Sequence, residues 1–296
     1  MEKASNTPLP RPYPFGVSEF TTWPWSFEQD VDQYGAIGVD AIEVCEFKLA
    51  GLHPGEVARV IGERSMAVGS VQPAVRTLFP SLSQPEPKSP RDRMERFQRT
   101  IERLALLGDN VPFVTNTGRP PSGNIEELLQ VAASEYRRAA DFAARHGARI
   151  AFEPLNPTIM NVESAIWTVE QAIELIERVD RESFGLCLDY WNVWQNADVE
   201  AWIRQAGSRI FVVQVSDWRT PRSFQDRRIP GDGAIPLAAL MQATRESGYT
   251  GPYSVEIFSG DVPDSLWKSD LRGVLESSRR GMDRAWFDAE QLSSVP

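Results

Sequence analysis

Four acidic or amide side chains occupy the same local position in four separate segments, each near the carboxyl end of a short apolar run. They are Glu153, Asp189, Gln214 and Glu256. Burying an unpaired carboxylate beside apolar residues is costly in free energy. A polar side chain repeated at the ends of four strand-like runs therefore indicates a common functional site at one end of a parallel sheet. Oxygen ligands of this kind suit a divalent cation, and the pattern therefore predicts a metal site.

The segments that carry these residues belong to a regular alternation along the chain. Apolar runs typical of strands alternate with segments whose apolar residues recur at the spacing of amphipathic helices. The expected strands are Phe15 to Phe20, Asp40 to Glu46, Ala67 to Val75, Asn110 to Thr115, Arg149 to Leu155, Phe184 to Trp191, Ile210 to Asp217 and Tyr253 to Phe258. The expected helices are Phe27 to Ala36, Gly55 to Arg64, Pro90 to Leu107, Ile125 to Arg145, Val169 to Val179, Val199 to Gln205, Leu237 to Ser247 and Ser265 to Ala285. This α/β pattern predicts one (β/α)8 TIM barrel domain over residues 1 to 296, with its core from about 15 to 288.

The composition narrows the class of partner. A formal net charge of −10 argues against nucleic acid, because duplex affinity comes mainly from cationic side chains that displace counterions. No apolar stretch approaches the roughly 20 residues of a membrane span, and the start of the chain lacks the order of a secretion signal. Cys45 and Cys187 lie inside apolar runs, where buried thiols suit a reducing compartment. We therefore expect a cytoplasmic protein with neither a membrane nor a nucleic-acid partner.

Short motifs around the four residues resemble the xylose isomerase-like barrels, a family of sugar isomerases, epimerases and related dehydratases. The matching pieces are Glu-Pro-Leu-Asn from Glu153, Leu-Asp at Asp189, Pro-Gly-Asp-Gly-Ala-Ile-Pro from Pro230 and Ser-Val-Glu at Glu256. The resemblance implies that Glu153 and Glu256 bind a divalent ion and also move protons. It further implies that Asp189 and the residue on the seventh strand, Gln214, complete the metal shell.

Two residues depart from the family pattern. Most members carry histidine where this chain has Gln214, and commonly another histidine where it has Asn192. The hydroxypyruvate isomerase branch is similar in using glutamine at the first of these positions, so we expect the amide oxygen of Gln214 to be a ligand. Asn192 keeps an amide that is able to hydrogen-bond a sugar hydroxyl. Because this shell is all oxygen, we expect Mn²⁺ or Mg²⁺.

Further residues near the expected strand ends are candidates for substrate binding. Glu46 and Lys48 follow the second strand, and a solvated pair on the rim is the alternative for them. The resemblance also implies a basic residue just before the Pro-Gly motif. Arg228 is preferred for that position over its neighbours Arg222 and Arg227.

Aromatic residues concentrate at the same expected strand ends. Trp23 and Trp191 are the candidates for a flat wall against a sugar ring. Core packing or the interface of a homo-oligomer accounts for each of these rings individually about as well.

The implied chemistry is enolisation. A metal that is chelated by adjacent oxygens of an α-hydroxy carbonyl stabilises an enediolate, while carboxylates remove and return protons. The leading expectation is an isomerase or epimerase acting on a small sugar or polyol, unphosphorylated because no glycine-rich phosphate loop is evident.

Three other functions were weighed against this one. A lyase that dehydrates a keto-polyol, such as an inosose or a dehydroshikimate, shares the same enolate. A noncatalytic carbohydrate-binding barrel is a second alternative. A DNA-repair nuclease of the same superfamily needs several histidines and a cationic groove, and this chain supplies neither.

Overall fold

The computed structural model describes residues 12–119, 122–220, 223 and 225–292 of the 296-residue chain. Within these residues, eight parallel strands close into a barrel in sequence order, and β8 returns to pair with β1. The strands are β1 (Phe15–Ser18), β2 (Ala41–Cys45), β3 (Ala67–Gln72), β4 (Pro112–Thr115), β5 (Arg149–Phe152), β6 (Phe184–Asp189), β7 (Ile210–Val215) and β8 (Tyr253–Val255). The prediction of a (β/α)8 barrel is thus confirmed.

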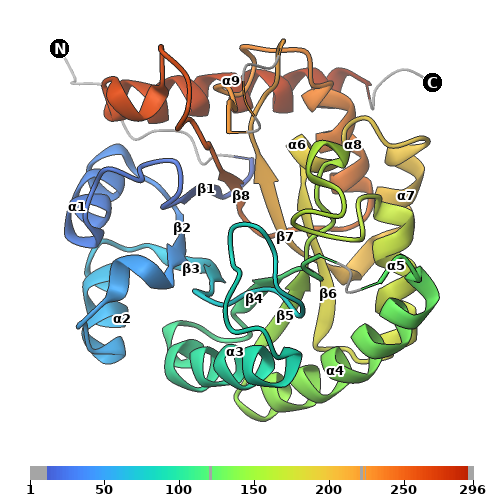
Figure 1. Ribbon diagram of the computed structural model, residues 1–296. Helices are drawn as coiled ribbons and strands as arrows, with labels where there is room; N and C mark the ends of the chain where they lie inside the picture. The colour runs from blue at the N-terminus through green and yellow to red at the C-terminus, as the bar shows by residue number, and fades with distance from the viewer. Residues whose placement is uncertain (1–11, 120–121, 221–222, 224, 293–296) are drawn as a thin grey trace, which may run out of the picture.

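Helices follow each strand and surround the barrel, with α9 lying beside the β1 and β8 seam (Figure 1). They are α1 (Phe27–Ile37), α2 (Pro54–Glu63), α3 (Pro90–Leu104), α4 (Ile125–Arg145), α5 (Val169–Val179), α6 (Tyr190–Val193), α7 (Val199–Ala206), α8 (Leu237–Glu246) and α9 (Leu271–Leu292). Short 3-10 turns are η1 (Glu46–Leu49), η2 (Ala105–Leu107), η3 (Pro157–Ile159), η4 (Gly207–Arg209) and η5 (Leu266–Lys268). None of the described helices is long and apolar enough to cross a bilayer.

Local sequence explains where several helices begin. Ser26 and Thr168 start α1 and α5 with capping boxes. In each box the hydroxyl of the cap accepts from a backbone amide of the first turn, and the side-chain oxygen of a glutamine in that turn accepts from the backbone amide of the cap. The apolar stripe of α5, which includes Ile173 and Ile176, is buried against the sheet. These two helices therefore start at polar caps, and α5 is held to the barrel by apolar packing.

The strands divide their side chains between two environments. Ile150 and Phe152 on β5 pack into the main core with the helices, whereas Ala151 between them joins a small cluster with Cys187 and Val212. This follows from the alternation of side chains along a strand. Cys187 is buried and free, as is Cys45.

The strand register brings the polar residues to one level of the barrel. Asp189 on β6 pairs with Gln214 on β7, and Gln214 pairs with Ser254 on β8. The backbone amides of Glu153 and Glu256 continue the ladder just beyond their strands, donating to Thr115 O at 2.8 Å and to Val215 O at 3.1 Å. The four segments therefore end together at the carboxyl face of the barrel.

Candidate active site

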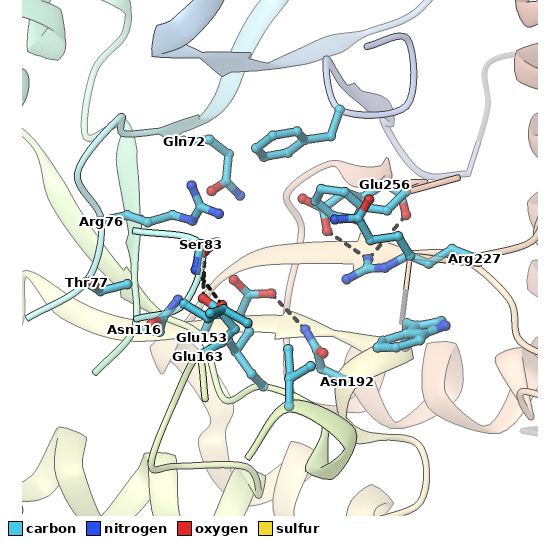
Figure 2. Close-up of a pocket in the computed structure, with 17 residues that line it drawn as sticks. Gln72, Arg76, Thr77, Ser83, Asn116, Glu153, Glu163, Asn192, Arg227 and Glu256 are labelled. Carbon is cyan, nitrogen blue, oxygen red and sulfur yellow. Dashed lines mark hydrogen bonds and ion pairs between the residues drawn. The ribbon is translucent and has the colours of Figure 1, made fainter. Parts of the chain in front are cut away.

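The carboxyl ends of the strands and the loops that follow them enclose a cavity of about 260 Å³. Figure 2 shows Glu153, Asn192, Glu256 and Arg227 around one part of it, with Arg76 on the opposite side. Apolar groups complete the wall, among them the rings of Phe20, Trp191 and Phe258. A mostly apolar cavity with a few converging polar groups is the usual form of a small-molecule site.

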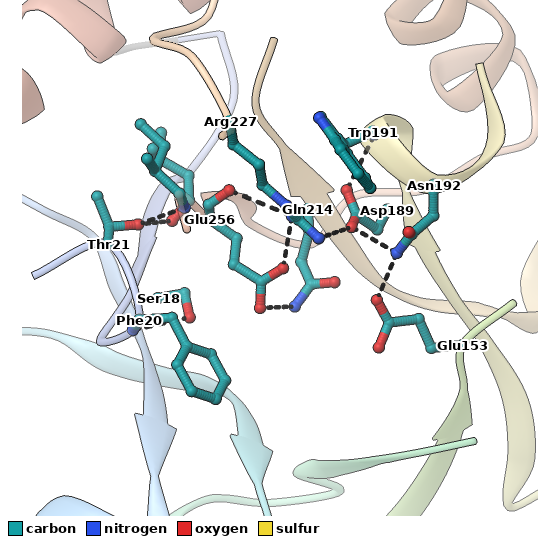
Figure 3. A network of polar contacts seen from close by, with 12 residues as sticks. Ser18, Phe20, Thr21, Glu153, Asp189, Trp191, Asn192, Gln214, Arg227 and Glu256 are labelled. Carbon is teal, nitrogen blue, oxygen red and sulfur yellow. Dashed lines mark hydrogen bonds and ion pairs between the residues drawn. The ribbon is translucent and has the colours of Figure 1, made fainter. Parts of the chain in front are cut away.

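Three carboxylates meet at the base of this cavity. Glu153, Asp189 and Glu256 each offer an oxygen within 4.8 Å of the others, and all three residues are buried. Figure 3 shows them converging from β5, β6 and β8. The sequence predicted this grouping from strand ends alone.

Asn192 joins two of these carboxylates. Its Nδ2 donates to Asp189 Oδ2 at 2.7 Å and to Glu153 Oε1 at 2.9 Å, while its Oδ1 accepts from the backbone amide of Asn156 at 2.9 Å. The geometry follows from α6, because Asp189 caps that helix by accepting from Trp191 N and turns Asn192 back toward the strand end. The expected contact to substrate stays a prediction, and the contact seen is to the carboxylates.

Arg227 supplies the positive charge of the site. Its Nη2 lies 2.9 Å from Asp189 Oδ2 and its Nη1 lies 2.8 Å from Glu256 Oε2. The guanidinium is flanked by the rings of Trp191 and Phe258, each with its centroid 4.8 Å away. Such a fork between two carboxylates is strongly directional.

The preference for Arg228 is not supported by its position. Arg228 pairs instead with Asp232 at 2.9 Å and does not line the cavity, and Arg222 lies outside the described residues. An antiparallel bridge between Asp217 and Arg228 makes this segment extended, so consecutive side chains point to opposite sides and Arg227 faces inward.

The Pro-Gly motif that follows is fixed from outside the barrel. Asp217 Oδ2 accepts from Gly231 N at 2.8 Å. Gly281 of α9 lies so close that an added Cβ would collide with the carbonyl oxygen of Pro230. The loop that carries Arg227 is therefore packed against the last helix.

Gln214 has an orientation that the sequence did not reveal. Its Nε2 donates to both carboxylate oxygens of Glu43 at 3.0 Å and to Glu256 Oε1 at 2.9 Å. Its Oε1 accepts from the thiol of Cys187 at 3.2 Å. In this arrangement the amide nitrogen, and not the oxygen expected to bind metal, faces the carboxylate groups. Glu43, on β2, is the buried partner that sequence reasoning missed, although a carboxylate in the middle of the apolar strand Ala-Ile-Glu-Val-Cys was a signal.

Glu46 and Lys48 are turned away from the cavity. Glu46 accepts from Thr100 Oγ1 at 2.9 Å and pairs with Arg103 at 2.7 Å, toward α3. Lys48 Nζ lies 2.6 Å from Asp30 Oδ2, toward α1. Neither residue lines the cavity, because the η1 turn rotates both side chains outward just after β2. The expectation that they contact substrate finds no support in their positions.

Of the two candidate tryptophans, one lines the cavity and the other lies outside it. Trp191 is buried and lines the cavity, and its contact with substrate stays a prediction. Trp23 is 44% exposed and stacks with Phe20 and Trp267 beside a neighbouring hollow.

The site perturbs the acidities of its carboxyl groups. Burial raises the pKa of Glu153 to about 8, with the charge of Asp189 as the second cause and Arg227 opposing both. Burial also raises the pKa of Asp189, and of Glu256 well above its ordinary value, against the opposing charge of Arg227. For Arg227 itself burial lowers the pKa, but the carboxylates outweigh burial and the net shift is upward. Carboxyls with such shifts in a cavity are characteristic of functional sites.

The charge balance fits a bound cation. Three buried carboxylates face Arg227, the guanidinium that neutralises part of their charge, and Glu43 adds a fourth acid behind Gln214. Buried anions of this density are stable only when they are paired or protonated, or when they bind a metal. Glu153, Asp189 and Glu256 have the oxygen donors that Mg²⁺ and Mn²⁺ prefer.

Comparison with known proteins identifies the class. The family model of the xylose isomerase-like TIM barrel matches residues 31–278, and the chain belongs to this family. It is 27% identical over 244 residues to 3-dehydroshikimate dehydratase of Pseudomonas aeruginosa, covering 78% of this chain and 36% of that protein. It is 30% identical over 138 residues to inosose isomerase of Bacillus subtilis, covering 45% of this chain and 48% of that enzyme.

The solved structures agree on the fold. The IOLI protein with a bound zinc atom superposes with a TM-score of 0.77 at 21% identity, covering 95% of this chain and 99% of that one. The matches to the two curated relatives span less than half of each relative's own length. The comparisons therefore place the chain in the xylose isomerase-like TIM barrel family, and its curated matches include a dehydratase and an isomerase, without fixing the reaction of this chain.

Proposed function

We propose that this protein is a divalent-metal-dependent isomerase or epimerase that acts on a small sugar or polyol-like hydroxy-carbonyl through an enediolate. One observation carries the proposal: buried carboxylates from three strands converge at one cavity, and their oxygens differ in the hydrogen bonds and ion pairs that they make. Removing and returning a proton next to a carbonyl requires such groups within reach of the same carbon.

Glu153 is the better placed of the two glutamates to exchange protons with a substrate. Asn192 holds its Oε1, and no described residue hydrogen-bonds its Oε2, which belongs to a side chain of the cavity wall. Glu256 has both oxygens engaged, by Gln214 and Arg227. We therefore assign proton transfer first to Glu153, with Glu256 as the second, more tightly held carboxylate.

Glu153, Asp189 and Glu256 would hold the metal, and their oxygen donors favour Mn²⁺ or Mg²⁺. A divalent ion bound there supplies polarisation of the substrate carbonyl and stabilises the negative charge that develops on its oxygen. Arg227 balances Asp189 and Glu256, Asn192 orients Glu153, and the rings of Trp191 and Phe258 exclude water from the face of the substrate.

Dehydration is the second candidate, and one observation favours it. The match to 3-dehydroshikimate dehydratase covers more of this chain than the match to inosose isomerase.

Proton NMR in heavy water tests and separates these reactions. The metal-loaded protein would be incubated with L-ribulose, an inosose and 3-dehydroshikimate in turn. Isomerisation or epimerisation exchanges a carbon-bound proton for deuterium at constant composition, whereas dehydration removes water and forms a new double bond. Glu153→Gln should abolish either signal, and the exposed Glu102→Gln should not. Saturable binding with no exchange into any compound would instead indicate a noncatalytic binding barrel.

A further inference from the structure

A second arginine, Arg76, lines the cavity, and its guanidinium has no hydrogen-bond or ion-pair partner among the described residues. Arg76 follows β3, and its backbone is fixed: its carbonyl accepts from Asn116 N at 3.0 Å and from Thr115 Oγ1 at 2.7 Å, and its amide donates to Gln84 Oε1 at 3.1 Å. Among the residues that the structure describes, none forms a hydrogen bond or ion pair with its guanidinium. The contact recorded for that group is the ring of Phe20, with its centroid 5.8 Å away.

This isolation is unusual for a guanidinium in a partly enclosed site. Arg227, on the other side of the same cavity, is satisfied by two carboxylates. Arg93, nearby behind the same loop, donates to Thr77 O, Gln84 O and Pro87 O. Arg76 is therefore the cation in the cavity wall whose charge remains available, and Figure 2 shows its guanidinium directed into the space between the walls.

A neutral donor lines the same side. Asn116 Oδ1 accepts from Gly118 N at 3.0 Å, which directs the amide oxygen to the loop and leaves the Nδ2 group without a partner among the described residues. Asn116 also lines the cavity. Ser83 is not a third donor, because its hydroxyl and its backbone amide are both taken by Glu163 at 2.6 and 2.8 Å.

We infer that the substrate carries a carboxylate, held by Arg76 with help from Asn116, on the wall opposite Arg227. The inference rests on the proposed function, because it names the substrate class of the same site. A planar guanidinium matches a carboxylate with two parallel hydrogen bonds. A phosphate dianion would call for more donors than one guanidinium and one amide. The roughly 260 Å³ of space suits a compact hydroxy acid whose carbonyl end reaches the three acids while its anionic end reaches Arg76.

The separation of charge within the cavity supports this orientation. Asp189 and Glu256 pair with Arg227 at one side of the cavity, where a substrate anion would meet repulsion, and the charge of Arg76 is close enough to Glu153 to lower the pKa of that carboxyl. The acid on the side of Arg76, Glu163, has its carboxylate engaged by the hydroxyl and the amide of Ser83. A carboxylated substrate therefore has one favourable direction of entry, with its carbonyl toward Glu153. This would fix which carbon loses its proton.

A matched pair of unreactive probes tests the inference without catalysis. Shikimate and its methyl ester have the same hydroxylated ring and differ in charge. Their dissociation constants would be measured by calorimetry on the purified protein, both metal-loaded and chelator-treated, with inorganic phosphate as a third probe. The variants are Arg76→Gln and Arg76→Lys, and the control is Arg119→Gln, which removes an exposed arginine outside the cavity lining.

We expect shikimate to bind at least roughly 30-fold more tightly than its ester, because a desolvated charge pair is at stake. Arg76→Gln should abolish this preference, Arg76→Lys should restore only part of it, and Arg119→Gln should leave it intact. Equal binding of the two probes, no Arg76-dependent binding of either, or a preference that survives Arg76→Gln would overturn the inference. An Arg76-dependent preference for phosphate over shikimate would also overturn it.

The outcome is separable from that of the proposed function. Deuterium exchange into an uncharged sugar, with no preference for a charged probe in binding, would disprove the substrate carboxylate and support the proposed enolisation. Arg76-dependent binding without exchange into any compound would support the carboxylate and count against the enolisation.

Discussion

Two buried polar clusters lie near the carboxyl end of this barrel, and they differ in their access to the cavity. The site network consists of Glu153, Asp189, Asn192, Gln214, Glu256 and Arg227. The lysine cluster consists of Glu19, Thr22, Asp30, Tyr34 and Lys48 and lies between β1, η1 and α1. Each pairs a cation with a carboxylate, at 2.9 Å for Arg227 and Asp189 and at 2.6 Å for Lys48 and Asp30.

The lysine cluster is closed. Asp30 accepts from Lys48 and from Thr22 Oγ1 at 2.6 Å, and the Thr22 hydroxyl lies 2.5 Å from that of Tyr34. Burial, followed by the charge of Asp30, raises the pKa of Glu19 well above its ordinary value. Yet no member of the cluster lines the cavity beside Glu153 and Arg227. Burial and a shifted pKa are therefore common to both clusters. What distinguishes the site network is a carboxyl oxygen that faces the cavity.

The largest effect is expected from the two glutamates that line the cavity. Glu153→Gln and Glu256→Gln should each leave a folded protein and reduce turnover by about 10² to 10⁴, the loss that follows removal of positioned acid-base catalysis. Steady-state kinetics on the substrate found by NMR, with circular dichroism to check folding, provides the measurement. Near-normal turnover in either variant would remove that residue from proton transfer.

The lysine cluster should respond in stability and not in turnover. Lys48→Met leaves Asp30, which is fully buried, without its cation, and should lower the free energy of unfolding by about 3 to 5 kcal/mol. The value of kcat should change little. Urea denaturation measures the effect, and Lys88→Met, at an exposed lysine, is the control. A large fall in kcat with unchanged stability would mean that the closed cluster takes part in the reaction.

The pH dependence of stability should also distinguish the site. Because burial raises the pKa of Glu153 to about 8 from an ordinary value of 4.5, the folded protein keeps a proton that the unfolded chain loses. The unfolded state then binds fewer protons, so metal-free protein should lose stability as pH rises from about 4.5 to about 8, and no further above that.

Glu153→Gln should remove this component, which a rise of the pKa from 4.5 to about 8 places at up to about 5 kcal/mol over that interval. Denaturant midpoints for both proteins, measured in chelator across the pH range, test it. Parallel pH profiles for wild type and variant would contradict the raised pKa.

Metal affinity should change more modestly. Gln214→His offers an imidazole and should strengthen binding of Zn²⁺ relative to Mg²⁺, while Gln214→Ala should weaken retention of every ion by about 10- to 100-fold. Metal content and activity after chelation and re-addition give the readout. An untreated protein that carries no metal and stays fully active in chelator would disprove the metal site itself.

The smallest effect is spectroscopic. Substrate should quench or shift the emission of Trp191, which lines the cavity, so Trp191→Phe should remove most of the signal. Trp23→Phe should remove little, since that ring lies beside the neighbouring hollow. Saturating substrate with no spectral change in wild type would exclude an aromatic wall around the bound molecule.

The barrel and the three carboxylates could be predicted because both follow from strand periodicity. Parallel strands in one barrel end at one face, so the ends of β5, β6 and β8 had to meet. The choice between Arg227 and Arg228 could not be made, because it depends on the phase of an extended segment fixed by one bridge to Asp217. Lys48 was misplaced for a similar reason, since the η1 turn reverses the side-chain direction within a few residues.

The amide of Gln214 shows a different limit. Its position on β7 could be predicted from the sequence. The orientation of its amide could not, because it depends on Glu43, which is 171 residues away in the sequence and across the barrel. Arg76 was also overlooked as a cavity residue. Its significance comes from the partners that it lacks, which a sequence does not display.

The contact between Gly281 and Pro230 gives the protein a means of adjustment that is remote from its chemistry. Pro230 is three residues past Arg227, so a side chain at position 281 would displace the segment that sets the guanidinium against Asp189 and Glu256. Variation along one face of the final helix can thus retune the polarity of the cavity while every residue lining it stays the same. Substitutions on the outer helix α9 are therefore a way to change substrate preference without altering the residues that line the cavity.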